Sequence, residues 1–321
     1  MSIAAAAIAA TIVAVGAGAC SASSDDAGTC RTGADCPSGT CEAGICKSED
    51  ATSQGGAGGQ GSGGGDGGSP GEGGGASEGG GTSQGGGSPL CEIESDGEIR
   101  RDEVPLEAGY RASFLTTTTA DFSTQGSTED GERSWDFDVD FTGDHLVLSE
   151  TLDPSDQWFG ASFPDATYAS RLADATDLLG VFQATDDALL LLGVASQSDG
   201  NTRTELTYDP PVIVLSFPLQ EGNEWSTTTT VSGLAQGVGV FYSEVFDNEV
   251  DARGVAKTPY GDFDVLRTRV DLTRTIGFLV TTQRTFAFVT ECFGTVARVV
   301  SQENDTTAEF DNPSEVLRLS P

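Results

Sequence analysis

A glycine-rich stretch from Gln54 to Ser88 divides this chain of 321 residues into two parts. Apart from Pro70 it contains no apolar side chain larger than that of alanine, so it buries too little to offset the entropy lost on ordering. A compact domain does not hold a structureless loop of about 35 residues. We therefore expect residues 51–88 to be a disordered Gly/Ser-rich linker with an r.m.s. span of roughly 30–35 Å.

The net charge of −34 restricts the partners of the chain. From Pro89 onward there are 41 Asp and Glu against 14 Lys and Arg, which gives a net charge of −27. A surface with this charge repels nucleic acid and anionic membranes, so neither is expected as a partner. High net charge also keeps a protein soluble, and this interpretation needs no specific ligand.

Residues 1–19 have the composition of a signal peptide. Ile3 to Val15 form an apolar run that is too short to span a bilayer as a helix, and Ala17-Gly18-Ala19 satisfies the small-x-small rule for cleavage before Cys20. The segment resembles a bacterial lipobox, and the resemblance implies that Cys20 is acylated. Ser21 is not Asp, which by similarity to the usual sorting rule implies an outer membrane lipoprotein, either periplasmic or surface-exposed.

Two interpretations of Cys20 stay open. Ordinary cleavage would leave it as a free thiol, whereas acylation would make it a lipid attachment site. The chain has seven Cys, so acylation of Cys20 leaves an even six to form disulfides. An unpaired Cys in an exported protein would need its own explanation, and this favours acylation.

Residues 20–50 contain four closely spaced cysteines, namely Cys30, Cys36, Cys41 and Cys46. Zinc sites usually place ligands in C-x2-C pairs, and no His lies nearby, so two disulfides in an oxidising compartment are the better interpretation. The three possible connectivities stay open. The spacing resembles the Dickkopf N-terminal type of motif found near the anchors of myxobacterial surface proteins, which implies a spacer or a docking element.

Residues 89–321 show the period-two alternation of β-strands. Trp135 to Phe141 alternates aromatic and Val residues with Asp, and Phe278, Val280, Phe286 and Phe288 fall on one face of a later segment. The turn at residues 259–262 predicts a hairpin. Further strands are expected at Leu146–Leu152, Ala166–Leu172, Gly180–Gln183, Ala188–Ser196, Thr204–Tyr208, Trp225–Val231, Val238–Val250, Val255–Lys257, Leu266–Leu272, Thr295–Ser301 and Glu315–Leu319.

No long segment has a helical period, so the domain is predicted to be all-β. More than ten strands joined by short turns predict a curved antiparallel sheet that forms a closed or half-open barrel. Closure would also remove edge strands, which are an aggregation hazard for Thr- and Val-rich segments.

Three motifs between Pro211 and Ser301 carry a family resemblance. The segments Pro218–Trp225, Tyr260–Asp264 and Cys292–Ala297 are similar to the P-L-x-x-G-x-x-W, G-x-F-D and closing-strand motifs of the TapB-like group of bacterial exported proteins and lipoproteins. The resemblance implies an antiparallel, barrel-like fold and carries no catalytic residues. Each motif also has a purely structural interpretation, with Gly222 in a turn and Trp225 in the core.

The residues do not indicate an enzyme. His145 is the single His of the chain, and there is no G-x-S-x-G motif to present a nucleophile beside it. Asp136, Asp138, Asp140 and Asp144 are weak candidates for a Ca²⁺ site, although the residues required at later positions of an EF-hand loop are missing. We expect no cofactor and no catalytic residue.

These observations favour a lipid-anchored envelope protein with a non-enzymatic binding or structural β domain. Its expected partners are the membrane, through the acyl anchor, and an envelope protein or glycan that the sequence does not identify. Two alternatives stay open: a tethered envelope polysaccharide hydrolase, which would use a pair of carboxylates, and a Ca²⁺-dependent adhesive module.

Two cysteines lie within the predicted β domain, one near each of its ends. Acylation would remove Cys20 from the count, and the four cysteines of residues 30–46 can satisfy one another, so Cys91 and Cys292 have only each other as partners. We predict that they form a disulfide, with their Cα atoms about 5–6 Å apart.

Overall fold

The computed structural model describes residues 41–42, 45–46 and 91–321. The predicted signal peptide, Cys20, Cys30, Cys36 and the linker lie outside the described residues. In the cysteine-rich segment, β1 (Cys41–Glu42) pairs antiparallel with β2 (Ile45–Cys46), and the side chains of these residues are also outside the description. The two disulfides expected there stay predictions.

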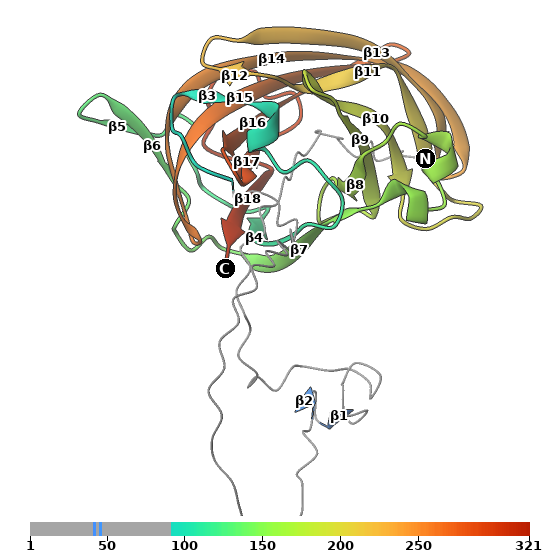
Figure 1. Cartoon of the computed structure of the whole chain (residues 1–321). Coiled ribbons are helices and arrows are strands. Elements are labelled where there is room, and N and C mark those ends of the chain that lie inside the picture. Colours follow the sequence, from blue (N-terminus) through green and yellow to red (C-terminus); the bar gives the residue numbers. More distant parts are fainter. Residues whose placement is uncertain (1–40, 43–44, 47–90) are drawn as a thin grey trace, which may run out of the picture. The chain divides into compact units, whose positions relative to one another are not determined.

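Twelve strands form a closed antiparallel barrel, as predicted (Figure 1). The ring closes because β13 pairs with β14 as well as with β11. In order around the ring the strands are β13 (Glu224–Ala235), β11 (Glu205–Ser216), β10 (Ala188–Ser196), β9 (Leu178–Ala184), β8 (Tyr168–Arg171), β7 (His145–Leu152), β4 (Arg111–Thr117), β18 (Glu315–Ser320), β17 (Gly294–Val300), β16 (Leu279–Thr290), β15 (Gly261–Ile276) and β14 (Val238–Thr258).

Shorter elements decorate this ring. β5 (Ser127–Glu129) and β6 (Glu132–Asp136) form a hairpin that joins β14 through a parallel pairing of β6. β3 (Glu98–Ile99) pairs with β12 (Leu219–Gln220). Residues 91–321 also contain three 3-10 turns: η2 (Arg101–Glu103), η3 (Pro154–Asp156) and η4 (Gly160–Ser162).

The observed strands differ from the predicted ones in several places. The strand expected from Trp135 to Phe141 ends at Asp136, because the chain then leaves the sheet after Phe137 donates to the carbonyl of Lys257. The separate strands expected at 238–250 and 255–257 are one strand, since a β-bulge between Val250 and Ala252 lets β14 continue across the irregularity.

One predicted apolar face is also wrong in part. Phe286 and Phe288 are fully buried, as expected, but Phe278 lies in the turn before β16 and is fully exposed. Val280 is more than half exposed as well. The alternating apolar pattern of the sequence reaches back to Phe278, but only the later part of β16 lies in the core. The hairpin turn predicted at residues 259–262 is present, with Thr258 paired to Gly261.

A segment of the chain that precedes the first barrel strand fills part of the interior. This segment, residues 97–106, is called the plug below. Its side chains Ile99, Val104 and Leu106 are buried in one core cluster with residues of β8, β10, β11 and β14, and Figure 1 shows it running within the ring of strands. The backbone N–H of Cys292 donates to the Glu103 carbonyl at 2.7 Å, which ties the plug to the β16–β17 connection.

The predicted disulfide is present at this connection. Cys91 is bonded to Cys292 with their Cα atoms 5.5 Å apart, across a sequence separation of 201 residues. The bridge is at Cys91, a few residues before the plug starts at residue 97. It therefore fixes the point at which the chain enters the barrel.

Replacing Cys91 or Cys292 with Ser should lower the free energy of unfolding by about 2–5 kcal/mol, because the bridge restricts a loop of 201 residues in the unfolded chain. Urea unfolding under oxidising conditions measures this. The double variant should match each single variant, since all three lose the same bond. Wild-type and variant proteins unfolding at the same urea concentration would contradict the prediction.

Candidate functional site

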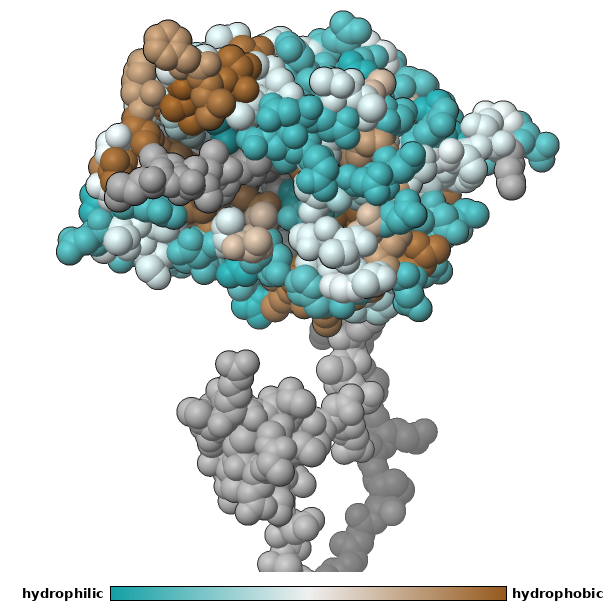
Figure 2. All heavy atoms as spheres, turned by 180° about the vertical axis from the view of Figure 1, so that it is seen from behind, coloured by the Kyte–Doolittle hydropathy of each residue, from teal (hydrophilic) through white to brown (hydrophobic). Residues whose placement is uncertain are grey.

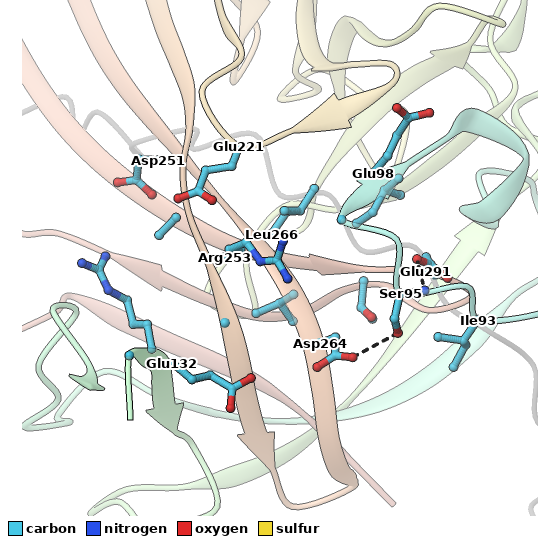
Figure 3. Close-up of a pocket in the computed structure, with 18 of the residues that line it drawn as sticks. Ile93, Ser95, Glu98, Glu132, Glu221, Asp251, Arg253, Asp264, Leu266 and Glu291 are labelled. Atoms are coloured by element: carbon cyan, nitrogen blue, oxygen red, sulfur yellow. Dashed lines mark hydrogen bonds between the residues drawn. The ribbon is translucent and has the colours of Figure 1, made fainter. Parts of the chain in front are cut away.

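A pocket of about 800 Å³ lies where the chain enters the barrel. Its wall comes from the segment before and within the plug, the β5–β6 hairpin, the β12–β13 turn, strands β14 and β15, and the end of β16. Its volume is in the range of small-molecule sites. It is therefore the candidate functional site of the described domain (Figure 3).

The lining of this pocket is strongly acidic. Its apolar side chains include Ile93, Ile99 and Leu266, and Figure 3 shows the guanidinium of Arg253 among the surrounding carboxylates. Arg253 also lies against Gly97 of the plug, where an added Cβ would be 3.2 Å from its Nη1 atom. Seven lining residues are acids: Glu98, Asp130, Glu132, Glu221, Asp251, Asp264 and Glu291.

Two of these acids fasten the chain just before the plug. The buried carboxylate of Glu291 accepts hydrogen bonds from the backbone N–H groups of Glu94 and Ser95, at 2.5 and 3.0 Å. The hydroxyl of Ser95 donates to Asp264 at 3.0 Å, as Figure 3 shows. Glu291 precedes Cys292, so these bonds and the disulfide hold the same few residues.

Asp251 has a different task, which the β-bulge of β14 makes possible. It lies at the bulge, where the side chain can be redirected toward a neighbouring strand. Its two oxygens accept from Nε and Nη2 of Arg267, both at 2.8 Å. Arg267 also donates to Glu309 at 2.7 Å and to the Thr124 carbonyl at 2.6 Å. The pocket therefore backs onto a buried bidentate ion pair.

The Arg267 side chain is 2% exposed and packs against aromatic rings. Its guanidinium carbon is 4.2 Å from the ring centre of Phe286 and 5.3 Å from that of Trp135. Burial alone would raise the pKa of Glu309, but hydrogen bonds from Arg267 and Thr124 lower it below the usual value. Glu309 is therefore charged at neutral pH and completes the neutralisation of Arg267.

Three more buried arginines are each paired with a carboxylate. Arg274 donates to Glu244 at 2.6 Å with both side chains at most 5% exposed. Arg298 pairs with Glu315, and the fully buried Arg318 binds both oxygens of Asp144 at 2.8 and 2.5 Å. Each arginine faces an opposite charge inside the fold, and in the Arg318–Asp144 pair the planar guanidinium matches both carboxylate oxygens.

The four Asp considered for Ca²⁺ do not form a common cage. Asp144 is occupied by Arg318, and although burial alone would raise its pKa, the hydrogen bonds from Arg318 and from the backbone of Phe141 lower it. Asp136 instead accepts from the backbone N–H of Asp138. Among residues 41–42, 45–46 and 91–321, no three His, Cys, Asp or Glu side chains are placed to hold a metal ion.

His145 begins β7 and is about half exposed. Its Nε2 atom is 2.9 Å from Oδ2 of Asp174, and its Nδ1 atom is 3.2 Å from the carbonyl oxygen of Gly143. The hydrogen bond with Asp174 raises the pKa of His145 above its usual value. This is a surface contact between the start of β7 and the β8–β9 connection.

The family-like motifs have structural positions in this fold. Gly222 has a φ of +89° in the turn between β12 and β13. Trp225 is half-buried in β13, and its indole N–H donates to the Ile213 carbonyl at 2.9 Å. Neither residue lines the acidic pocket.

Sequence reasoning missed the acidic pocket and the buried arginines. The strand predicted at Leu266–Leu272 places Leu266 and Arg267 on opposite faces of the sheet, yet both residues are buried. One signal was available: the chain has fourteen Arg and two Lys. Arg is the cation preferred in buried and bidentate pairs, so this bias was an indication of ion pairs inside the fold.

No protein family, curated protein or solved structure matches this chain. In the part of the chain that the structure describes, no helix has the length and apolar character needed to cross a bilayer.

Replacing Arg267 with Met should lower the free energy of unfolding by about 3–5 kcal/mol, because Asp251 and Glu309 would lose their buried cation. Chemical denaturation measures the change. Arg253→Met is the matched control: this arginine is exposed in the pocket, and its loss should cost less than about 1 kcal/mol. Equal effects of the two substitutions would refute the ion-pair argument.

The single His makes a pH prediction simple to test by NMR. The folded pKa of His145 is raised, so its contact with Asp174 stabilises the fold below the usual His pKa and is lost as the pH rises through the raised value. Asp174→Asn should bring the His145 pKa back toward its usual value. A titration curve that is identical in the two proteins would show that Asp174 is not the cause.

Proposed function

We propose that this chain is a lipid-anchored protein of the bacterial cell envelope whose β-barrel is a non-enzymatic binding or structural domain. In this proposal Cys20 carries the lipid, the linker gives reach, and the barrel is presented to the envelope or the cell surface. The outer membrane is the proposed location. The relation to the TapB-like group is part of the same proposal.

The attachment of the plug is the observation that carries this proposal. The chain is fixed by a disulfide at Cys91, its backbone at residues 94 and 95 is bound by the carboxylate of Glu291, and it then enters the barrel core. A segment that follows a linker is usually frayed. Here it is fixed covalently at its first residue, as suits a domain held at the end of a tether.

The packing of the interior supports a structural or binding role over transport. Side chains of the plug meet those of β10, β11 and β14 in a core cluster that includes Leu191, Val212 and Phe246. These residues are at most 1% exposed. A barrel filled in this way presents its outer surface and its ends to partners, rather than a lumen.

The acidic pocket is the proposed binding surface at one end. Glu132 and Glu221 lie exposed at its rim, while Asp251, Asp264 and Glu291 are engaged in holding the fold together. Carboxylates around an open cavity select cationic groups, such as the Lys and Arg side chains of another envelope protein. The hydrolase alternative would need two carboxylates directed at one bond, and Asp251, Asp264 and Glu291 are instead engaged by Arg267, Ser95 and the backbone of residues 94–95.

Cys20→Ser should release the protein from the membrane fraction, because Ser cannot carry the acyl chains that hold it there. Cell fractionation followed by a carbonate wash at high pH measures this, because such a wash removes proteins that are inserted only shallowly and leaves acylated proteins in the membrane. Cys91→Ser is the control: it removes a cysteine of the same chain but leaves the proposed lipid site intact, so the protein should stay with the membrane. Retention of the Cys20→Ser protein after the wash would overturn the proposed anchor.

A further inference from the structure

Two neighbouring hairpins end in exposed apolar side chains. The β13–β14 and β15–β16 turns lie at the same end of the barrel, because β14 pairs antiparallel with both β13 and β15. We call this the apolar end, and Figure 2 shows apolar side chains gathered at one corner of the domain. Six of its side chains are between 42% and 107% exposed: Val238, Phe241, Ile276, Phe278, Leu279 and Val280.

The apolar end is also free of charge. No Asp, Glu, Lys or Arg occurs from Trp225 to Ser243 or from Thr275 to Gln283, in a chain of which 21% is charged. The charges that follow and precede these segments, Glu244 and Arg274, are buried and paired with each other. Arg203 borders this surface beyond β13: its carbonyl accepts from the backbone N–H of Gly237, and its side chain pairs with Asp199.

The backbone at this end is paired almost to its tips. Ala235 pairs with Val238 and Ile276 pairs with Leu279, so each hairpin closes with a two-residue turn. Gly237 and Gly277 have φ values of +78° and +60°, which such turns require. A hairpin paired to its tip leaves few N–H and C=O groups to desolvate, which is the condition for entering hydrocarbon.

The shape and charge of the apolar end favour a lipid layer over a second copy of the chain as its partner. The Phe278 side chain is fully exposed at a turn, so it projects from the surface instead of lining a groove. A second copy would bring the same net charge of −27 to the contact, and like charges oppose such association. A fluid, uncharged layer of acyl chains accepts projecting apolar tips without a complementary groove.

The tether allows this end to reach a bilayer. Cys292 of the disulfide follows the last residue of β16, whereas the apolar end contains the first residue of this strand. At the usual rise of a strand, the two ends of β16 are about 40 Å apart. A flexible coil of the length predicted for residues 51–88 would span roughly 30–35 Å, and more when extended. A chain anchored at Cys20 can therefore lie along the membrane with its apolar end against it.

We propose that the apolar end inserts shallowly into a zwitterionic bilayer surface. This goes beyond the proposed function and relies on it only for the nearness of a membrane. The acidic remainder of the domain should make binding weaker on anionic lipid, and added salt should restore it by screening the repulsion.

The test uses the full chain carrying Cys20→Ser, so that no acyl chain holds it to the lipid. It should float with phosphatidylcholine vesicles, and Phe241→Ser with Phe278→Ser should lower its partition coefficient at least about tenfold. The matched control is Leu146→Ser with Leu148→Ser, which removes two equally exposed leucines from β7. The control should bind as the parent does, and both variants should unfold at the same urea concentration as the parent.

A second measurement places the tip directly. With Phe278→Trp, brominated lipids should quench the added fluorescence most strongly when the bromines lie shallow in the acyl region. The proposal is overturned if the parent chain does not float, or if the β7 control loses binding to the same extent. It is also overturned if light scattering shows dimers that Phe278→Ser dissociates, because the apolar end would then join two copies. The membrane retention of the natural chain tests the anchor separately.

Discussion

The pairing of β13 with β14 is the constraint on which the rest of this domain depends. It closes twelve strands into a ring, and a ring of this size encloses more space than strand side chains fill unaided. The plug supplies Val104 and Leu106 to that space. Because the plug must thread inward at a fixed place, the bridge at Cys91 and the carboxylate of Glu291 hold its entrance.

Charge is divided between buried and exposed positions of this domain. Arginines such as Arg267 and Arg318 are buried, each with a carboxylate, whereas the excess of acids is on the exposed surface. Buried pairs of this kind do not add much stability compared with apolar residues, but breaking one is costly. The apolar end around Phe278 stands apart from this pattern, since it presents neither sign of charge to solvent.

Local patterns were sufficient to predict the all-β fold, most strands and the Cys91–Cys292 bridge. They were insufficient where the outcome depends on neighbours distant in sequence. The alternation around Arg267 does not reveal that Glu309 covers its outer face, and nothing near Ile99 shows that this residue lies inside a ring formed later in the chain. The acidic pocket combines six separate segments, so no local motif announces it.

The position of the disulfide decides how the domain responds to tension. A pull transmitted along the linker reaches Cys91 first and passes through the sulfur atoms to Cys292, at the end of β16. Residues 97–106 follow Cys91 in the chain, so the force bypasses the plug and does not draw it out of the barrel. The strain is delivered instead to β16, whose antiparallel pairing with β15 and β17 shares it over many hydrogen bonds.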